Sequence, residues 1–228
     1  MQQLRHDPRT IALLLVVPAA LVGLLAWSLV NRPGSFQALG PRLLGIFPLT
    51  VMFLVTSVTT LRERTNGTLE RLLTMPLAKA ELILGYAGAF GVVAIVQSAL
   101  VSTLSYTWYG LAHQGIPWRI SAVALCAGLL GTAFGLALSA LAKTEFQAVQ
   151  FMPAFILPQL LLCGLMVPLA LLPTGLRNVA DVLPMTAAVH AITPAQSTSY
   201  YFEQFAIMVA YIVVALIVGS TTLRRRTK

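Results

Sequence analysis

The sequence predicts an all-α integral membrane protein with six transmembrane helices, and both its composition and its patterning support that fold class. Hydrophobic residues make up 57% of the 228 residues and charged residues only 10%, and the mean hydropathy is +0.83. These values lie far outside the usual mix of soluble globular domains. The apolar residues gather in runs of about 20, the length that a helix needs to cross roughly 30 Å of hydrocarbon. The runs do not alternate polar and apolar residues, as the strands of a membrane β-barrel would.

Six apolar runs predict the spans in order along the chain, within a single transmembrane domain of residues 1–228. None of them contains Asp, Glu, Lys or Arg, as expected for helices in lipid. The first run is longer than the core of about 7–15 residues in a secretory signal, so we expect it to be retained as a span. The predicted spans are roughly 11–30, 43–61, 82–106, 120–142, 150–171 and 205–223.

The segment between the last two spans, residues 172–203, is neither plainly polar nor long enough in its apolar parts to span. Pro184 separates two short apolar pieces at helical spacing, 176–183 and 185–192. Proline cannot continue a helix without losing a hydrogen bond. The segment therefore predicts two short outer helices, interfacial or partly re-entrant, followed by an aromatic belt at the head of the last span. The belt residues are Tyr200, Tyr201 and Phe202.

The basic residues predict which side of the membrane each loop faces. With both termini on one side, 11 of the 15 Lys and Arg residues lie on that side and four on the other. The positive-inside rule makes the richer side cytoplasmic. The net charge of +8 is then mostly this bias, and no nucleic-acid partner is needed to explain it. The eleven are Arg5, Arg9, Arg62, Arg64, Arg71, Lys79, Lys143, Arg224, Arg225, Arg226 and Lys228, and the four are Arg32, Arg42, Arg119 and Arg177.

The connection between the second and third spans, residues 62–81, is a charged stretch on the predicted cytoplasmic side. Three leucines beginning at Leu69 share one face of a helix, at i, i+3 and i+4, and the charged residues beside them point elsewhere. Pro76 ends the pattern. The stretch predicts a short amphipathic helix lying along the membrane surface, although for an arbitrary loop a plain interfacial linker would be the favoured explanation.

Three motifs carry a family resemblance. The first is the run Arg62, Glu63, Arg64, Gly67, Thr68, Leu69, Glu70, Arg71, Leu72, Leu73 and Pro76, followed by Glu81 to Gly85. It closely resembles the loop between the second and third spans of ABC-2 type transporter permeases, the family that includes daunorubicin-resistance export proteins. Arg5 to Thr10 resembles the family's Arg-x-Asp-Pro lead into the first span, and Pro184 to Ile192 resembles the segment before its last span. Only nine residues precede Thr10, so we expect a shortened amino-terminal lever or a start further upstream.

The resemblance implies a permease subunit of an ATP-binding cassette exporter in the plasma (inner) membrane of a prokaryote, with both termini cytoplasmic. Two such permeases, identical or related, would enclose a pathway, and a pair of cytoplasmic ATPase subunits would bind beneath them with ATP and Mg²⁺. Residues 62–64 and 67–73 would form the ATPase-coupling helix. The chain has no Gly-x-x-x-x-Gly-Lys-Ser/Thr phosphate loop, so we expect no cofactor and no catalytic residue of its own.

The substrate is expected to be hydrophobic or amphiphilic, such as a drug-like compound or a lipid. No Asp, Glu, Lys or Arg lies within the predicted spans, where a highly charged solute would need a partner. The same pattern weighs against the main alternative, an ion-coupled secondary transporter or channel without an ATPase. An intramembrane enzyme would need a nucleophile and base or metal ligands, and neither His-Glu-x-x-His nor Gly-x-Ser-x-Gly occurs. An assembly or anchoring subunit stays open as a further alternative.

Small and polar residues within the predicted spans predict helix packing. Gly131 and Gly135 form a Gly-x-x-x-Gly pair that permits close approach of a second helix, either within the chain or from another subunit. Gln97, Gln150 and Gln159 are expected to bond across helices rather than to line a pathway. The histidines lie apart in the sequence without ligand spacing, so no metal site is predicted.

Overall fold

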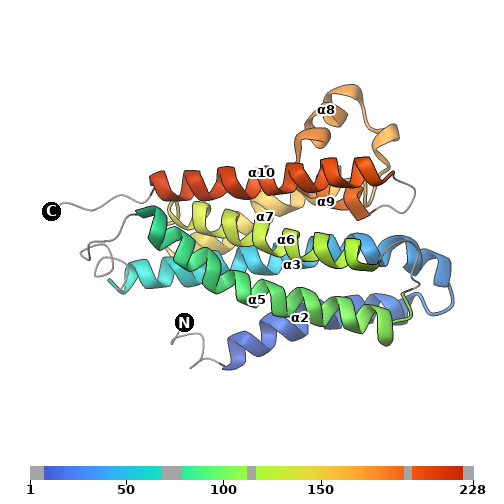
Figure 1. Cartoon of the computed structure of the whole chain (residues 1–228), viewed down its shortest axis with the longest axis horizontal. Coiled ribbons are helices and arrows are strands. Elements are labelled where there is room, and N and C mark those ends of the chain that lie inside the picture. The colour runs from blue at the N-terminus through green and yellow to red at the C-terminus, as the bar shows by residue number, and fades with distance from the viewer. Residues whose placement is uncertain (1–7, 68–78, 112–116, 193–196, 223–228) are drawn as a thin grey trace.

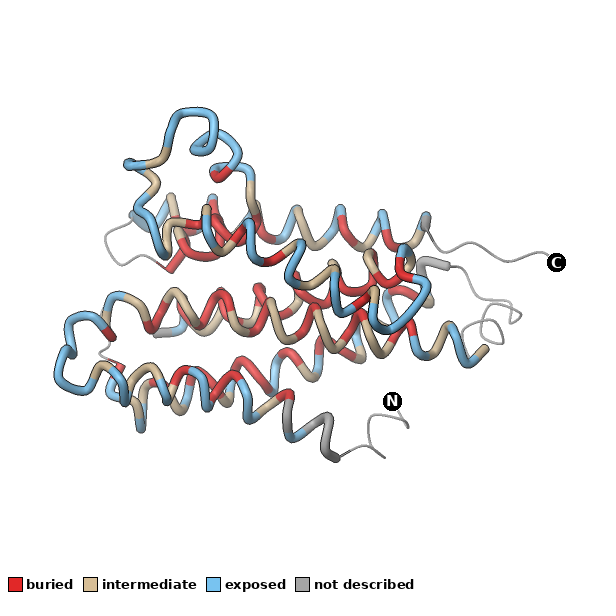
Figure 2. The backbone as a smooth tube through the Cα atoms, turned by 180° about the vertical axis from the view of Figure 1, so that it is seen from behind, coloured by how far each residue is buried: buried red, intermediate tan, exposed pale blue. Residues whose placement is uncertain are grey.

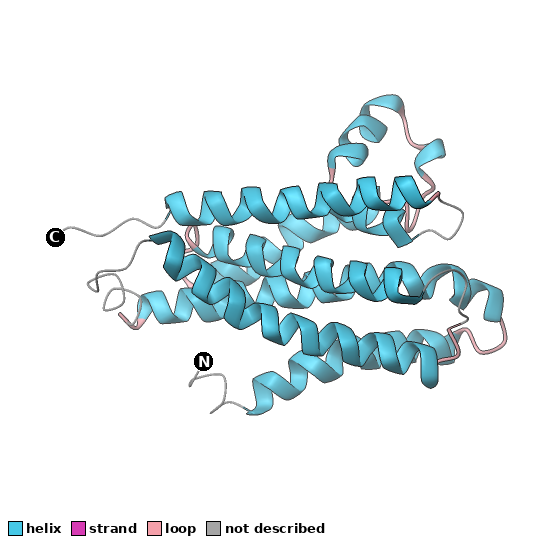
Figure 3. Cartoon of the chain, viewed as in Figure 1, coloured by secondary structure: helices cyan, strands magenta, loops and turns pink. Residues whose placement is uncertain are grey.

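The computed structural model describes residues 8–67, 79–111, 117–192 and 197–222. Eight α-helices and one short 3-10 helix lie in these ranges, with no strand among the described residues (Figure 3). The elements are α2 (Pro8–Ser28), α3 (Pro33–Thr65), α5 (Lys79–Thr107), α6 (Pro117–Ser139), α7 (Glu145–Leu162), η1 (Leu169–Leu171), α8 (Thr174–Val182), α9 (Pro184–Ile192) and α10 (Thr198–Thr222).

The long helices run alongside one another as one bundle (Figure 1). α2 begins and α10 ends at the same end of the bundle, where α3 and α6 also end and α5 and α7 begin (Figure 1). Among the described residues, four helices are long and apolar enough to cross a membrane, namely Pro33–Thr65, Glu81–Thr107, Trp118–Ser139 and Thr198–Thr221. They coincide with four of the six predicted spans. Of the other two, α2 contains a shorter apolar stretch, Leu14–Ser28, and α7 has 18 residues.

α3 and α6 form the centre of the bundle. In the most apolar stretch of α6, 67% of the residues are buried, against 17% in α10, and Figure 2 shows the buried positions gathered along the middle of the bundle. A Cβ added to Gly131 would overlap the backbone carbonyl of Leu49, and one added to Gly135 would lie 2.8 Å from the backbone oxygen of Phe53. The structure thus places the Gly-x-x-x-Gly pair against α3 of the same chain, where it lets two helix backbones approach closely.

α3 is much longer than the span predicted from the sequence. The apolar run begins at residue 43, whereas the helix begins at Pro33 and continues through Pro41 and Pro48. A proline in the first turn replaces an amide that would have no helical partner, and a long membrane helix tolerates interior prolines when neighbouring groups satisfy the freed carbonyls. Most of the outer loop expected before residue 43 is therefore the first part of α3.

α7 is shorter at its far end than the predicted fifth span, and the expectation of a continuous helix over 150–171 is wrong. The helix begins at Glu145 and ends at Leu162. Gly164 follows with a φ of +83°, a left-handed conformation that ends many helices and that glycine adopts without strain. The apolar residues that follow lie in an irregular stretch and in η1.

Two short helices follow, as the sequence predicts, but they differ in burial. α8 has only one buried residue, Ala180, and stands out from the side of the bundle (Figure 1). Every residue of α9 except His190 is buried. A hydrogen bond holds the start of α9 inside the bundle. The backbone N–H of Met185 donates to the side-chain oxygen of Gln159 in α7 at 3.3 Å. Gln159 therefore bonds across helices, as predicted, whereas the prediction is wrong for Gln97, whose buried side chain has no hydrogen-bond partner among the described residues.

The predicted aromatic belt at the head of α10 is only partly a belt. Phe202 is 53% exposed, but Tyr201 is 2% exposed. Tyr200 shares a hydrogen bond with the Nδ1 atom of His190 in α9 at 2.9 Å. Successive residues of a helix point in different directions, so three aromatic residues in a row cannot all face lipid.

Candidate functional site

The candidate functional site is built on the last turn of α3, where the predicted coupling stretch begins. Arg62, Glu63 and Arg64 are consecutive, so their side chains leave the helix about 100° apart and do not face one another. The structure directs the three side chains to three different helices, α7, α5 and α6. Together they join the end of α3 to its neighbours.

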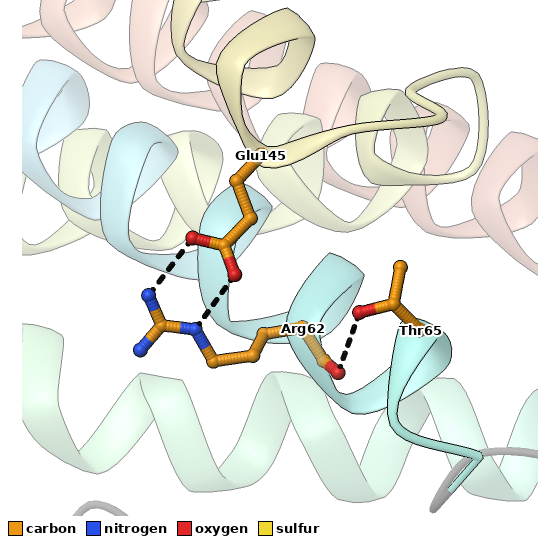
Figure 4. A network of polar contacts seen from close by, with 3 residues as sticks. All are labelled: Arg62, Thr65 and Glu145. Carbon is orange, nitrogen blue, oxygen red and sulfur yellow. Dashed lines mark hydrogen bonds and ion pairs between the residues drawn. The ribbon is translucent and has the colours of Figure 1, made fainter.

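Arg62 makes a two-pronged ion pair with Glu145, the first residue of α7 (Figure 4). Arg62 Nε donates to Glu145 Oε1 at 3.0 Å, and Arg62 Nη2 donates to Glu145 Oε2 at 2.9 Å. Thr144 caps α7, since its hydroxyl accepts the backbone N–H of Gln147 at 3.2 Å. A carboxylate in the first turn is also favoured by the helix dipole. The local sequence thus begins α7 at Glu145 and holds that carboxylate within reach of α3.

Arg64 donates hydrogen bonds to backbone carbonyls at the carboxyl-terminal end of α6. Its Nη1 donates to the backbone oxygen of Ala140 at 2.9 Å and to that of Ser139 at 3.5 Å. The last carbonyls of a helix have no partner within the helix. A basic side chain that reaches them from a neighbouring helix supplies hydrogen bonds and interacts favourably with the negative end of the helix dipole.

Glu63 joins α3 to α5. Its carboxylate accepts a hydrogen bond from the hydroxyl of Tyr86, which lies two turns into α5, and both side chains are partly buried. We call the five residues Arg62, Glu63, Arg64, Tyr86 and Glu145 the helix-end clamp. The clamp connects the end of α3 with α5, α6 and α7.

α3 ends at Thr65, and the chain turns away immediately after it. The Thr65 hydroxyl donates to the backbone oxygen of Arg62 at 3.0 Å (Figure 4). Gly67 has a φ of +76°, in the left-handed region that glycine enters without steric cost. The remaining predicted coupling residues lie outside the described part of the chain, so their amphipathic helix stays a prediction. They are Thr68, Leu69, Glu70, Arg71, Leu72 and Leu73.

The exposure of the Arg62–Glu145 pair sets its strength. The side chains are 55% and 47% exposed, and ion pairs this exposed contribute about 0–1 kcal/mol to stability. The hydrogen bond from Arg62 lowers the pKa of Glu145 below its ordinary value, slight desolvation opposes this, and the positive charge of Arg62 lowers it further. A pair of this strength holds the helix ends in register without locking them together.

Two clamp residues, Tyr86 and Glu145, were not predicted from the sequence. The sequence could have indicated Glu145, because it is the only acidic residue between Glu81 and Asp181. It also directly follows a threonine, a residue type that often caps helices. No sequence pattern indicates Tyr86 as a polar partner, since a tyrosine in an apolar helix most often serves packing.

Comparison with known proteins relates most of the chain to one family. The ABC-2 type transporter family matches residues 1–197. The chain is 30% identical over 145 residues to the Probable multidrug ABC transporter permease YbhR of Escherichia coli (strain K12), covering 64% of this chain and 39% of that protein. It is 26% identical over 135 residues to the Linearmycin resistance permease protein LnrN of Bacillus subtilis (strain 168), covering 59% of this chain and 35% of that protein. The matched part thus spans about two fifths or less of the length of these relatives.

Four long apolar helices among the described residues lie in one bundle (Figure 1) and indicate a multi-pass membrane protein. The chain belongs to the ABC-2 type transporter family. Members of this family are transport subunits, and the four long apolar helices of the described residues agree with a transmembrane chain.

Proposed function

We propose that this chain is the permease subunit of an ABC exporter that moves a hydrophobic or amphiphilic substrate outward with ATP hydrolysed on a separate subunit. The helix-end clamp is the observation that carries the proposal. It fixes the end of α3, from which residues 68–78 continue, to α5, α6 and α7. A push on that stretch therefore reaches four helices together, as a rigid-body movement of packed helices requires.

Residues 62–81 form the coupling element in this proposal. The leucines of the loop, beginning with Leu69, are anchors for a groove in the ATPase, and the charged residues beside them form a rim that sets register. The complex contains two permease subunits, identical or related, and a pair of ATPase subunits. ATP and Mg²⁺ bind on the ATPases.

The clamp end of the bundle faces the cytoplasm in this proposal. The bias of Lys and Arg supports this orientation, and so does the position at that end of the start of α2 and the end of α10 (Figure 1). The chain crosses the plasma membrane of a prokaryote six times, through α2, α3, α5, α6, α7 and α10. α9 enters the bundle from the outer side without crossing it.

The proposed substrate is a drug-like compound or a lipid. The names of two relatives support a drug-like substrate, since one is a probable multidrug permease and the other a linearmycin resistance permease. The absence of Asp, Glu, Lys and Arg from the predicted spans points the same way, because a highly charged solute would find no partner there.

The first experiment asks whether an ATPase binds through the loop. Tagged chain is purified from detergent-solubilised native membranes, and the proteins that co-purify are identified for wild type and for a Leu69→Asp, Leu72→Asp variant. We expect an ATPase subunit with wild type and its loss in the variant, because two carboxylates on the apolar face of the helix oppose its burial. Val30→Asp is the matched control, since Val30 is an exposed apolar residue in the α2–α3 connection at the opposite end.

Two results would contradict the proposal. An intact wild-type complex that contains no ATPase would favour an ion-coupled transporter or an assembly subunit. Loss of the ATPase in Val30→Asp as well would show that the loop variant acts by damaging the fold. Drug accumulation in a deletion strain tests the substrate, and no change over a chemically broad panel would count against drug export.

A further inference from the structure

At the end of the bundle opposite the clamp, the guanidinium of Arg119 in α6 lies over the ring of Tyr201 in α10. Its guanidinium carbon lies 5.0 Å from the centre of the Tyr201 ring, and its Nη2 donates to the Thr198 hydroxyl at 2.9 Å. Tyr201 is buried and is held in turn by Trp118, edge-on at a centroid distance of 5.9 Å, and by Phe205, stacked at 5.9 Å. Stacking and one hydrogen bond therefore fix the guanidinium in place.

The charge of Arg119 is not balanced by the residues that the structure describes. No carboxylate oxygen among them lies within 4.0 Å of its nitrogens, and its Nε is buried without a hydrogen-bond partner. The segments 112–116 and 193–196, which lie outside the described residues, contain no Asp or Glu. Arg119 also lies in the first turn of α6, where the helix dipole adds positive potential. A fixed guanidinium in this setting favours a bound anion.

The surroundings of Arg119 favour an anion that carries an apolar body. Trp118 precedes Arg119 on α6, Phe202 lies edge-on to Tyr201 on α10, and each of the two is 53% exposed. Exposed aromatic side chains at the ends of spanning helices lie at the boundary between hydrocarbon and head groups. Phosphate groups of lipids lie at the same level, and the planar fork of arginine matches phosphate oxygens.

We propose that Arg119 and Thr198, flanked by Trp118 and Phe202, bind the phosphodiester head group of an anionic membrane lipid. The free Nη donors of Arg119 and the Thr198 hydroxyl bind the phosphate oxygens, and the two exposed rings lie against the glycerol and the upper acyl chains. All four residues belong to one chain. The site therefore requires neither nucleotide nor an ATPase and is independent of the proposed function.

The test measures which lipids the full chain keeps. The protein, with any subunits that co-purify, is equilibrated with equal amounts of phosphatidylcholine and phosphatidylglycerol, and the lipids that remain bound in mild detergent are counted by native mass spectrometry. We expect wild type to retain phosphatidylglycerol preferentially and Arg119→Gln to lose that preference several-fold. Arg32→Gln is the matched control, because it removes one exposed arginine from the same end of the bundle and should retain phosphatidylglycerol like wild type.

Three results would overturn the proposal. One is unchanged retention in Arg119→Gln, and another is an equal loss in Arg119→Gln and Arg32→Gln, which would reflect overall charge. A third is displacement of phosphatidylglycerol by soluble glycerol phosphate at equal concentration, which would identify a site for free anions. If Arg119→Gln does not fold, Arg119→Lys and Thr198→Val carry the test, and both should lower retention at a normal elution volume, whereas full retention in both would also overturn the proposal.

Discussion

α3 is held by a close apolar contact with α6 in the middle of the bundle and by exposed polar contacts at its end. In the middle, Gly131 and Gly135 bring the two backbones so close that a single added carbon has no room. At the end, the Arg62–Glu145 pair is about half exposed. Packed interiors resist small changes, whereas exposed ion pairs break and reform at little cost. The first contact therefore fixes the spacing of α3 and α6, and the second joins the helix ends more weakly.

The largest effect is expected from Gly131→Val, which breaks the mid-bundle contact. The new side chain would overlap the backbone of Leu49, and backbone cannot move aside as the tip of a side chain can. Overpacking costs about 1–3 kcal/mol and more where nothing can relax, so we expect loss of the folded peak in fluorescence-detected size-exclusion chromatography. Gly88→Val on α5 is the control, because a Cβ there meets nothing within 4 Å. A normal elution profile for Gly131→Val would show that α3 and α6 are not held this tightly.

A smaller loss of stability is expected from Arg64→Met. The variant keeps much of the side-chain length but leaves the carbonyls of Ser139 and Ala140 without their charged donor. Hydrogen bonds from charged groups contribute about 1.5–3 kcal/mol when buried, and the partial exposure of Arg64 places the expected loss near the lower limit. Thermal unfolding in detergent would measure it, with Arg64→Lys retaining part of the stability. An unchanged midpoint in Arg64→Met would mean that water replaces the arginine fully.

Glu145→Gln should separate stability from transport. Because the ion pair is worth about 0–1 kcal/mol, we expect almost no change in the unfolding midpoint. ATP-dependent export should nevertheless fall, because α7 loses its charged link to the end of α3. The reversed pair, Arg62→Glu with Glu145→Arg, should recover part of the export that each single change removes. Full export in both single variants would show that the pair takes no part in coupling.

The smallest effect is a dependence of stability on pH. Since Arg62 lowers the pKa of Glu145 below its ordinary value of 4.5 in the folded chain, the folded state binds this proton less readily than the unfolded state does. The pair therefore contributes its stability fully above about pH 4.5, and the contribution is lost as the pH falls through the lowered pKa. The difference in unfolding midpoint between wild type and Glu145→Gln should be small at neutral pH, as expected for a pair worth about 0–1 kcal/mol, and should vanish in acid. A difference that grows in acid would contradict this assignment.

The long helices could be predicted from the sequence because lipid imposes a minimum length of apolar chain on each of them. The end of α7 could not, since apolar residues continue to Leu171 while the backbone of Gly164 turns away. The burial of α9 is also a tertiary effect, because a nine-residue apolar helix looks the same in sequence at a surface and inside a bundle. The structure shows that its neighbours enclose it.

Only the α3 residues of the candidate site could be predicted from the sequence, and their partners could not. The charged triplet at the end of α3 is conspicuous in an apolar chain, so the sequence indicated Arg62, Glu63 and Arg64. Their partners lie elsewhere in the sequence, and Glu145 is 83 residues away from Arg62. Such pairings depend on how the helices pack, which no local pattern encodes.

The burial of α9 has a consequence for how the protein is made. A helix of nine residues rises about 14 Å, less than half of the roughly 30 Å of hydrocarbon, so membrane insertion machinery cannot hold it there as a span. It becomes stable in the bundle only when Gln159 of α7 and the buried faces of α3 and α10 surround it. Because α10 follows α9 in the chain and packs against it, we expect α9 to become fully buried only after α10 has been inserted.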